Sequence, residues 1–192
     1  SSNTQVLAQD GKLSDFGVIK EEYFMLVPPI TQTGLLFSQT EMVTIECGTR
    51  LTITPRIGDN NDITDVFLRD RQTGAVYWAS QAYDGSAGND YTSRAAISAD
   101  GHYAAFASGS SNLVPGDTNE SPDIFLYHLD TDTITRVSVS SSGDQVSARS
   151  DYPAVSAEGR YVSFDSYAPD VVPDDTNGYA DVFLRDRELG TT

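Results

Sequence analysis

Three short acidic loops carry the residue types in this sequence that are best suited to chemistry. Each loop has the pattern Asp-x-Asn-x-x-x-Asp, with two carboxylates and one amide at its first, third and seventh places. Alternating oxygen donors let a short loop curl around a hard cation, and the fifth-place backbone carbonyl can add a ligand. Oxygen-only donors favour calcium over zinc or copper. The sequence therefore predicts calcium sites at Asp59, Asn61 and Asp65, at Asp117, Asn119 and Asp123, and at Asp175, Asn177 and Asp181.

The same loop residues have a second interpretation that needs no ion. Asp and Asn side chains accept hydrogen bonds from backbone N–H groups two residues further on, and so they shape tight turns. Three registered copies of two carboxylates and an amide favour the calcium hypothesis. The turn-only interpretation remains its alternative.

The loops recur at a fixed spacing of 58 residues, since their leading aspartates stand at positions 59, 117 and 175. A second block has the same spacing: residues 97–106, ISADGHYAAF, match residues 155–164, VSAEGRYVSF. Two separate blocks that share one period indicate a duplicated structural unit.

Each period has the pattern of four short strands. Two apolar runs flank Ala-Asp-Gly or Ala-Glu-Gly, which is typical of a tight hairpin. The polar loop follows, then a strand over 124–127, then a fourth strand over 134–139, where apolar and polar residues alternate. Helix signals are nearly absent. The pattern predicts an all-β fold of β-propeller-type blades, each with four antiparallel strands, and about three blades in the chain.

The repeat motif resembles that of a known family. The hairpin Ser-Ala-Asp-Gly-x-Tyr-x-x-Phe, followed by Leu-Val-Pro-Gly-Asp-Thr-Asn and Asp-Ile-Phe-Leu, is similar to the TolB-like propeller repeats of bacterial secreted and surface proteins. This resemblance covers roughly residues 58–192. It implies a blade fold and an extracellular or cell-surface location, and it implies no particular activity, since propellers host many.

Residues 1–57 depart from the repeat and are predicted to form a divergent N-terminal segment ahead of a propeller-repeat region over 58–192. Two hairpins are predicted within it, 23–27 with 35–38 and 42–45 with 51–54. The third repeat ends where its fourth strand is expected, and residues 4–8 resemble such a strand. These residues are expected to complete that blade, within one chain or in a neighbouring copy.

Charge and motif content exclude several classes of function. The 12 basic and 28 acidic residues give a net charge of −16, which disfavours binding to nucleic acid or to an anionic membrane surface. The sequence has no Gly-x-Ser-x-Gly elbow, phosphate loop or dinucleotide fingerprint. Its two histidines, His102 and His128, occupy different places in the repeat, so neither a His-based triad nor a His-based metal centre is predicted.

The sequence therefore predicts a non-enzymatic, extracellular, calcium-stabilised propeller module that associates with copies of itself. Three blades are fewer than the four that a closed propeller needs, and self-association into a ring or a head-to-tail filament would cover the exposed sheets. Two alternatives remain. One is a carbohydrate-binding or carbohydrate-active propeller that uses surface tyrosines to stack on glycans, and the other is a fragment of a longer propeller.

Overall fold

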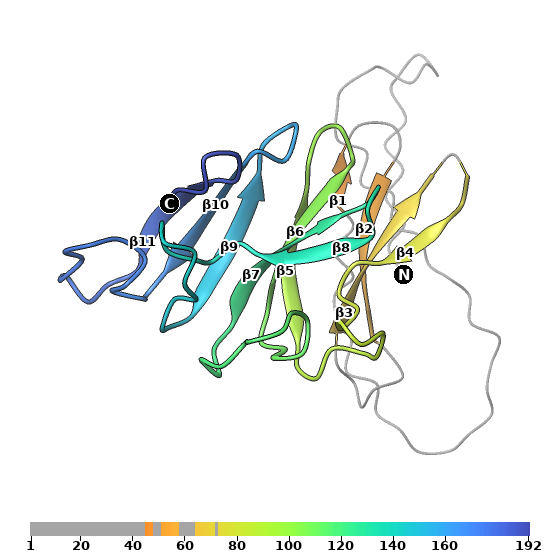
Figure 1. Cartoon of the computed structure of the whole chain (residues 1–192). Coiled ribbons are helices and arrows are strands. Elements are labelled where there is room, and N and C mark those ends of the chain that lie inside the picture. The colour runs from red at the N-terminus through yellow and green to blue at the C-terminus, as the bar shows by residue number, and fades with distance from the viewer. Residues whose placement is uncertain (1–44, 48–50, 58–63, 72) are drawn as a thin grey trace, which may run out of the picture. The chain divides into compact units, whose positions relative to one another are not determined.

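The computed structural model describes residues 45–47, 51–57, 64–71 and 73–192. These residues form three antiparallel sheets (Figure 1). The first sheet has the strand order β1-β2-β3-β4, the second β5-β6-β7-β8 and the third β11-β10-β9. No helix among these residues is long and apolar enough to cross a membrane.

The strands are short, with three to seven residues each. The first sheet contains β1 (Ile45–Cys47), β2 (Leu51–Ile57), β3 (Thr64–Asp70) and β4 (Val76–Trp78). The second contains β5 (Thr92–Ile97), β6 (Tyr103–Ser108), β7 (Asp123–His128) and β8 (Thr133–Arg136). The third contains β9 (Ser150–Val155), β10 (Tyr161–Ser166) and β11 (Asp181–Asp186).

Within each sheet, strands that follow one another in the sequence pair with each other, so each sheet is an antiparallel meander. This arrangement is the unit of a propeller blade. The 58-residue period holds to the residue, because β5, β6 and β7 each lie 58 positions before β9, β10 and β11. The predicted all-β fold of propeller-type blades is confirmed.

The hairpin turns follow from the Ser-Ala-Asp/Glu-Gly motif. The Ser98 side chain accepts a hydrogen bond from the Tyr103 amide at 3.0 Å, and Gly101 adopts a φ of 78°, which closes the turn. The same contact and conformation recur at Ser156 and Gly159. A Cβ atom on Gly159 would also lie 2.2 Å from the ring of Tyr103, so this glycine permits a close approach between two repeats.

The second sheet is buried on both faces. On β7, Phe125 and Tyr127 belong to one apolar cluster, which also contains Val66 and Leu68 of the first sheet. Residues 124 and 126, on the opposite face, belong to a second cluster with β10 and β11 of the third sheet. A continuous apolar run such as Ile-Phe-Leu-Tyr is the pattern expected of a strand that is covered on both sides.

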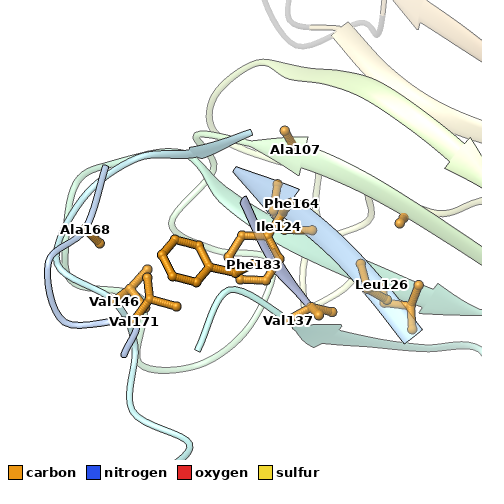
Figure 2. Packing of buried hydrophobic residues seen from close by; sticks show 11 residues of the cluster. Ala107, Ile124, Leu126, Val137, Val146, Phe164, Ala168, Val171 and Phe183 are labelled. Carbon is orange, nitrogen blue, oxygen red and sulfur yellow. The ribbon is translucent and has the colours of Figure 1, made fainter. Parts of the chain in front are cut away.

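Figure 2 shows the cluster between the second and third sheets. Phe164 and Phe183 lie with their ring centroids 6.0 Å apart, within a cluster that includes Ile124 and Leu126. Burying a side chain of this size stabilises a fold by about 1.5–3 kcal/mol. Face-to-face packing of apolar sheets therefore holds successive repeats together.

The fourth strand of the second repeat is shorter than predicted. The sequence predicts it over 134–139, whereas β8 ends at Arg136. After Arg136 the chain turns inward: the Ser138 hydroxyl donates to Asp123, and the Val139 amide bonds to the Val137 carbonyl two residues back. The strand therefore ends two residues before Ser138, whose hydroxyl is bonded to the buried Asp123 carboxylate.

β1 and β2 precede residue 58 and still belong to the first sheet. They form a hairpin with the register Ile45↔Ile53, and β2 then pairs with β3 along its whole length. The predicted donated strand over 4–8 and the predicted hairpin of 23–27 with 35–38 lie outside the described residues.

Candidate functional site

The acidic loop of the second repeat is tied to the outer strand of its own blade. Asp123 begins β7 and is fully buried, and its carboxylate accepts a hydrogen bond of 2.6 Å from the Ser138 hydroxyl. Arg136 on β8 lies 3.2 Å from both Asp117 and Asp123, and only 10% of its side chain is exposed. A buried guanidinium therefore stands where the sequence predicts a calcium ion.

Two amide side chains complete this loop. Gln145 donates from its Nε2 atom to Asp117 and to Asp123, at 2.9 Å each. Asn119 donates to the backbone carbonyl of Val146 at 2.9 Å, while its own side-chain oxygen accepts from the amide of Ser121 at 3.0 Å. Each predicted calcium ligand of this loop therefore has protein partners.

Burial raises the pKa of Asp123 to about 6, and this effect outweighs the lowering by Ser138, Arg136 and Gln145. The carboxylate of Asp117 nearby adds to the increase. Two carboxylates and one guanidinium share the cluster, and the loss of water around Asp123 is only partly offset by its hydrogen bonds.

In the first repeat the structure describes Asp65, whereas Asp59 and Asn61 lie outside the described residues. Asp65 is buried and accepts a hydrogen bond of 2.9 Å from Ser80, which stands 58 residues before Ser138. Ser80 also accepts from the Trp78 ring nitrogen at 3.1 Å. A serine that donates to the last loop aspartate from two residues beyond the outer strand is thus common to both repeats.

The third loop is more open to solvent. The amide of Asn177 donates to Asp181 at 2.7 Å, and the Asn177 oxygen accepts from the backbone of Tyr179 at 2.7 Å. This turn matches that of Asn119 with Ser121, so both fully described loops have the geometry of the turn interpretation. Asp175 and Asp181 line an open surface groove with Asn177. In the described part of the chain, neither aspartate has an ion-pair partner.

The third sheet has an outer face formed by Ser163 and Asp165 of β10 and by Val182 and Leu184 of β11, which are cross-strand partners. Val182 is 79% exposed and Leu184 is 56% exposed. Their equivalents in the second sheet, residues 124 and 126, are 0% and 1% exposed because the third sheet covers them. The outer face is therefore the same blade surface without its covering sheet.

Asp165 distinguishes this outer face from its counterpart in the second sheet. The equivalent residue is Ala107, which is buried in the cluster between the second and third sheets. The Oδ1 atom of Asp165 is buried and has no hydrogen-bond partner among the described residues. This oxygen is already shielded from solvent within the chain, so Asp165 carries a desolvation cost that Ala107 does not.

Sequence reasoning did not identify Arg136, Gln145 or Ser138 as partners of the acidic loop. Ser80 and Ser138 stand 58 residues apart, and this repeat spacing could have identified the serine as part of the site. Arg136 had no such signal, because its equivalent in the first repeat is Trp78. Among the described residues, no group of three or more His, Cys, Asp or Glu side chains already has the spacing of a metal site. Calcium at the predicted residues stays a prediction.

No family model and no curated protein sequence matches this chain. Among solved structures, a protein assigned as TolB from Agrobacterium tumefaciens matches with a TM-score of 0.46 and 21% identity, over 74% of this chain and 43% of that one. The β-propeller domain of the Trilobed protease from Pyrococcus furiosus, which has an open velcro topology, matches with a TM-score of 0.48 and 11% identity, over 81% and 42%. The chain spans less than half the length of either. The propeller-type fold rests on the sheets described above.

Proposed function

We propose that this chain is a non-enzymatic propeller module that associates with copies of itself through the outer face of the third sheet. The observation that supports this proposal is the contrast in exposure at equivalent positions. Val182 and Leu184 are open, whereas Ile124 and Leu126 are sealed by the next repeat. Burying each such side chain contributes about 1.5–3 kcal/mol, so leaving the pair in water is costly.

The first sheet carries a surface of the complementary kind. Phe67 of β3 stacks on Trp78 of β4 with ring centroids 5.8 Å apart, and both are half-buried. Phe67 is the equivalent of Phe125 and Phe183, whose rings pack against the preceding sheet of this chain. The outer face of the third sheet in one copy can therefore be covered by the Phe67 and Trp78 face of the first sheet in another copy.

Contact between these two different faces makes a head-to-tail interface. Such an interface closes into a ring if the rotation per copy fits, and otherwise it extends into a filament. We propose in addition that residues 4–8 of a copy pair with β11, because residues 189–192 followed by residues 1–11 resemble residues 129–143 of the second repeat. The motif resemblance supports assignment to TolB-like repeats of bacterial proteins and an extracellular or cell-surface location.

Sedimentation velocity of the double variant Val182→Asp/Leu184→Asp tests this proposal. Both side chains are exposed, so the variant keeps the fold, while two carboxylates on the docking face oppose association. We expect assemblies from the unaltered chain and monomers from the variant, with an apparent Kd raised at least a hundredfold. That factor corresponds to about 2.7 kcal/mol.

The matched control is Tyr83→Asp, which places a carboxylate on a residue of the loop between β4 and β5 that is 63% exposed and lies outside both proposed docking faces. This control is expected to assemble like the unaltered chain. Removal of residues 1–9 addresses the strand exchange separately, and assembly that survives this deletion would rule out the donated strand. A monomeric unaltered chain at high concentration contradicts the whole proposal.

Exposed tyrosines favour carbohydrate binding as a second candidate function. Tyr91, Tyr152 and Tyr167 are 43%, 59% and 57% exposed, and the Arg94 guanidinium lies 3.7 Å from the centroid of the Tyr152 ring. Aromatic faces of this kind stack on sugar rings. Retention of a monomeric chain on a glycan column, with loss of retention in Tyr152→Ala and Tyr167→Ala, would favour this candidate over self-association.

A further inference from the structure

Asn177 is the one asparagine in this sequence that a glycine follows, since the others precede Thr, Asn, Asp, Leu or Glu. Asparagine is a chemically labile residue, because its side-chain amide can be attacked by the backbone nitrogen of the next residue. A glycine at that place has no Cβ atom to hinder the attack. The Asn-Gly pair stands in the third acidic loop, between Asp175 and Asp181. A covalent change there would alter the charge of this loop.

The fold leaves the Asn-Gly pair open to solvent. Asn177 and Gly178 are both exposed, and the following Tyr179 is 76% exposed. A Cβ atom built on Gly178 would meet no atom of the described residues within 4 Å beyond its chain neighbours. Packing of the described residues therefore does not shield the glycine nitrogen or the Asn177 side chain from each other or from water.

Two hydrogen bonds hold the Asn177 side chain in place. Its oxygen accepts from the backbone N–H of Tyr179 at 2.7 Å, and its nitrogen donates to Oδ2 of Asp181 at 2.7 Å. Attack on the amide carbon moves negative charge onto the side-chain oxygen, and a donor that is already in place stabilises this charge. The Tyr179 N–H therefore has the position of an oxyanion donor.

The second repeat has the same turn with a different residue after the asparagine. The Asn119 oxygen accepts from the backbone N–H of Ser121 at 3.0 Å. Glu120 has a φ of 51°, close to the 71° of Gly178, so the main chain follows the same left-handed path in both loops. Glu120 carries a side chain, however, and the Asn119 nitrogen donates to the Val146 carbonyl at 2.9 Å. Asn119 is therefore a matched position at which the attack is hindered.

We propose that Asn177 is a site of spontaneous covalent modification, in which the Gly178 nitrogen attacks the side-chain amide carbon and closes a succinimide ring. The bond between this nitrogen and Cγ forms, and the bond between Cγ and Nδ2 breaks. The proton that the glycine nitrogen loses passes through water to the departing amide, which leaves as ammonia. Water then opens the ring at either of its two carbonyls and yields an aspartyl or an isoaspartyl residue.

The modification changes the charge and the hydrogen bonds of the third loop. An ionised carboxylate only accepts hydrogen bonds, so the bond from Asn177 to Asp181 is lost. Repulsion between two negative charges takes its place. The isoaspartyl form also adds a methylene group to the main chain and displaces the N–H of Tyr179. Both products are therefore expected to loosen the turn that precedes β11.

Peptide mapping by mass spectrometry of the full chain, incubated at neutral and at mildly alkaline pH, tests this site. We expect the mass gain of an amide-to-acid conversion at Asn177, and a faster conversion at the higher pH because base removes the glycine proton. Isoaspartyl peptide should accompany the aspartyl peptide, since direct hydrolysis of the amide gives aspartate alone. Asn119 in the same digest is the internal control and should convert at least about tenfold more slowly.

The variant Gly178→Glu copies the second repeat, in which Glu120 already adopts the left-handed conformation. It should stay folded by circular dichroism and slow the conversion of Asn177 at least about tenfold. Equal conversion of Asn177 and Asn119, an unchanged rate in Gly178→Glu, or aspartate without isoaspartate would overturn the proposal. The same mapping on Val182→Asp/Leu184→Asp separates the result from self-association, because that variant keeps the whole loop.

The variant Asn177→Asp carries the aspartyl product from the start. It should melt at a lower temperature than the unaltered chain in EDTA, because Asp181 loses a donor and gains a like charge beside it. An equal melting temperature would contradict the expected loosening of the turn.

Discussion

At the scale of single residues, the acidic loops are organised around buried carboxylates. Asp65 and Asp123 lie at the start of an inner strand, and each accepts a hydrogen bond from a serine two residues beyond the outer strand, Ser80 or Ser138. Leaving such a carboxylate without its donor costs about 1–3 kcal/mol, and more when the group is charged. These aspartates therefore have a structural role whether or not an ion binds.

The raised pKa of Asp123 makes stability depend on pH in a defined direction. Because the folded-state pKa of about 6 exceeds the ordinary aspartate pKa of 3.8, the folded chain holds more protons between these values. The free energy of unfolding then falls as pH rises from about 4 to 6, by at most about 1.4 kcal/mol per pH unit.

Replacement of Asp123 by Asn removes this titrating group. Urea unfolding at pH 4, 5, 6 and 7 should show a shallower loss of stability in Asp123→Asn than in the unaltered chain across pH 4 to 6. The absolute stability of the variant can be lower, since Arg136 loses one partner. Parallel pH profiles would show that Asp123 titrates at its ordinary pKa.

At the scale of loops and strands, the second acidic loop contains a cationic side chain and the third does not, among the described residues. The second already contains Arg136 against Asp117 and Asp123. Calcium could enter it only by displacing this guanidinium. The third loop exposes Asp175, Asn177 and Asp181 without an ion pair among the described residues, so we propose that calcium binds there first.

Calcium is expected to raise the melting temperature through the third loop. With a Kd of roughly 0.1 mM and about 2 mM free calcium, binding adds about 1.8 kcal/mol, or roughly 4 to 7 °C. Asp175→Asn should abolish this response, and Asp117→Asn should retain it. An identical melting curve in calcium and in EDTA would eliminate the calcium hypothesis.

The period of the sequence predicted the strands more completely than it predicted the site. Strands β9 to β11 follow β5 to β7 at 58 residues because local turn chemistry, such as Ser98 with Gly101, repeats with them. Arg136 and Gln145 come to the acidic loop from distant positions through pairing of β7 with β8 and the turn beyond, and spacing along the chain does not reveal such contacts. Likewise Val182 resembles Ile124 in sequence, and packing alone separates the exposed residue from the buried one.

The two histidines show the same limit. Each stands alone in the repeat pattern, and the sequence therefore predicted no role for them. Pairing of β6 with β7 brings Tyr103 opposite His128 and places His102 beside Asp130. In the third repeat the equivalent positions, Arg160, Asp186 and Glu188, also form ion pairs, which spacing along the chain does not reveal.

At the scale of the whole molecule, the described sheets stack so that each repeat seals one face of the repeat before it. The cluster around Val66 and Leu68 and the cluster around Ile124 and Leu126 are two copies of one interface. Val182 and Leu184 are exposed at the positions that would form one half of a third such interface.

Electron cryo-microscopy of the assembled chain measures the central claim most directly. The account predicts particles in which the first sheet of one copy covers the outer face of the third sheet of its neighbour, with Phe67 of one copy packed near Val182 and Leu184 of the next. Particles in which this face remains open to solvent, or in which two outer faces meet across a two-fold axis, would contradict head-to-tail association.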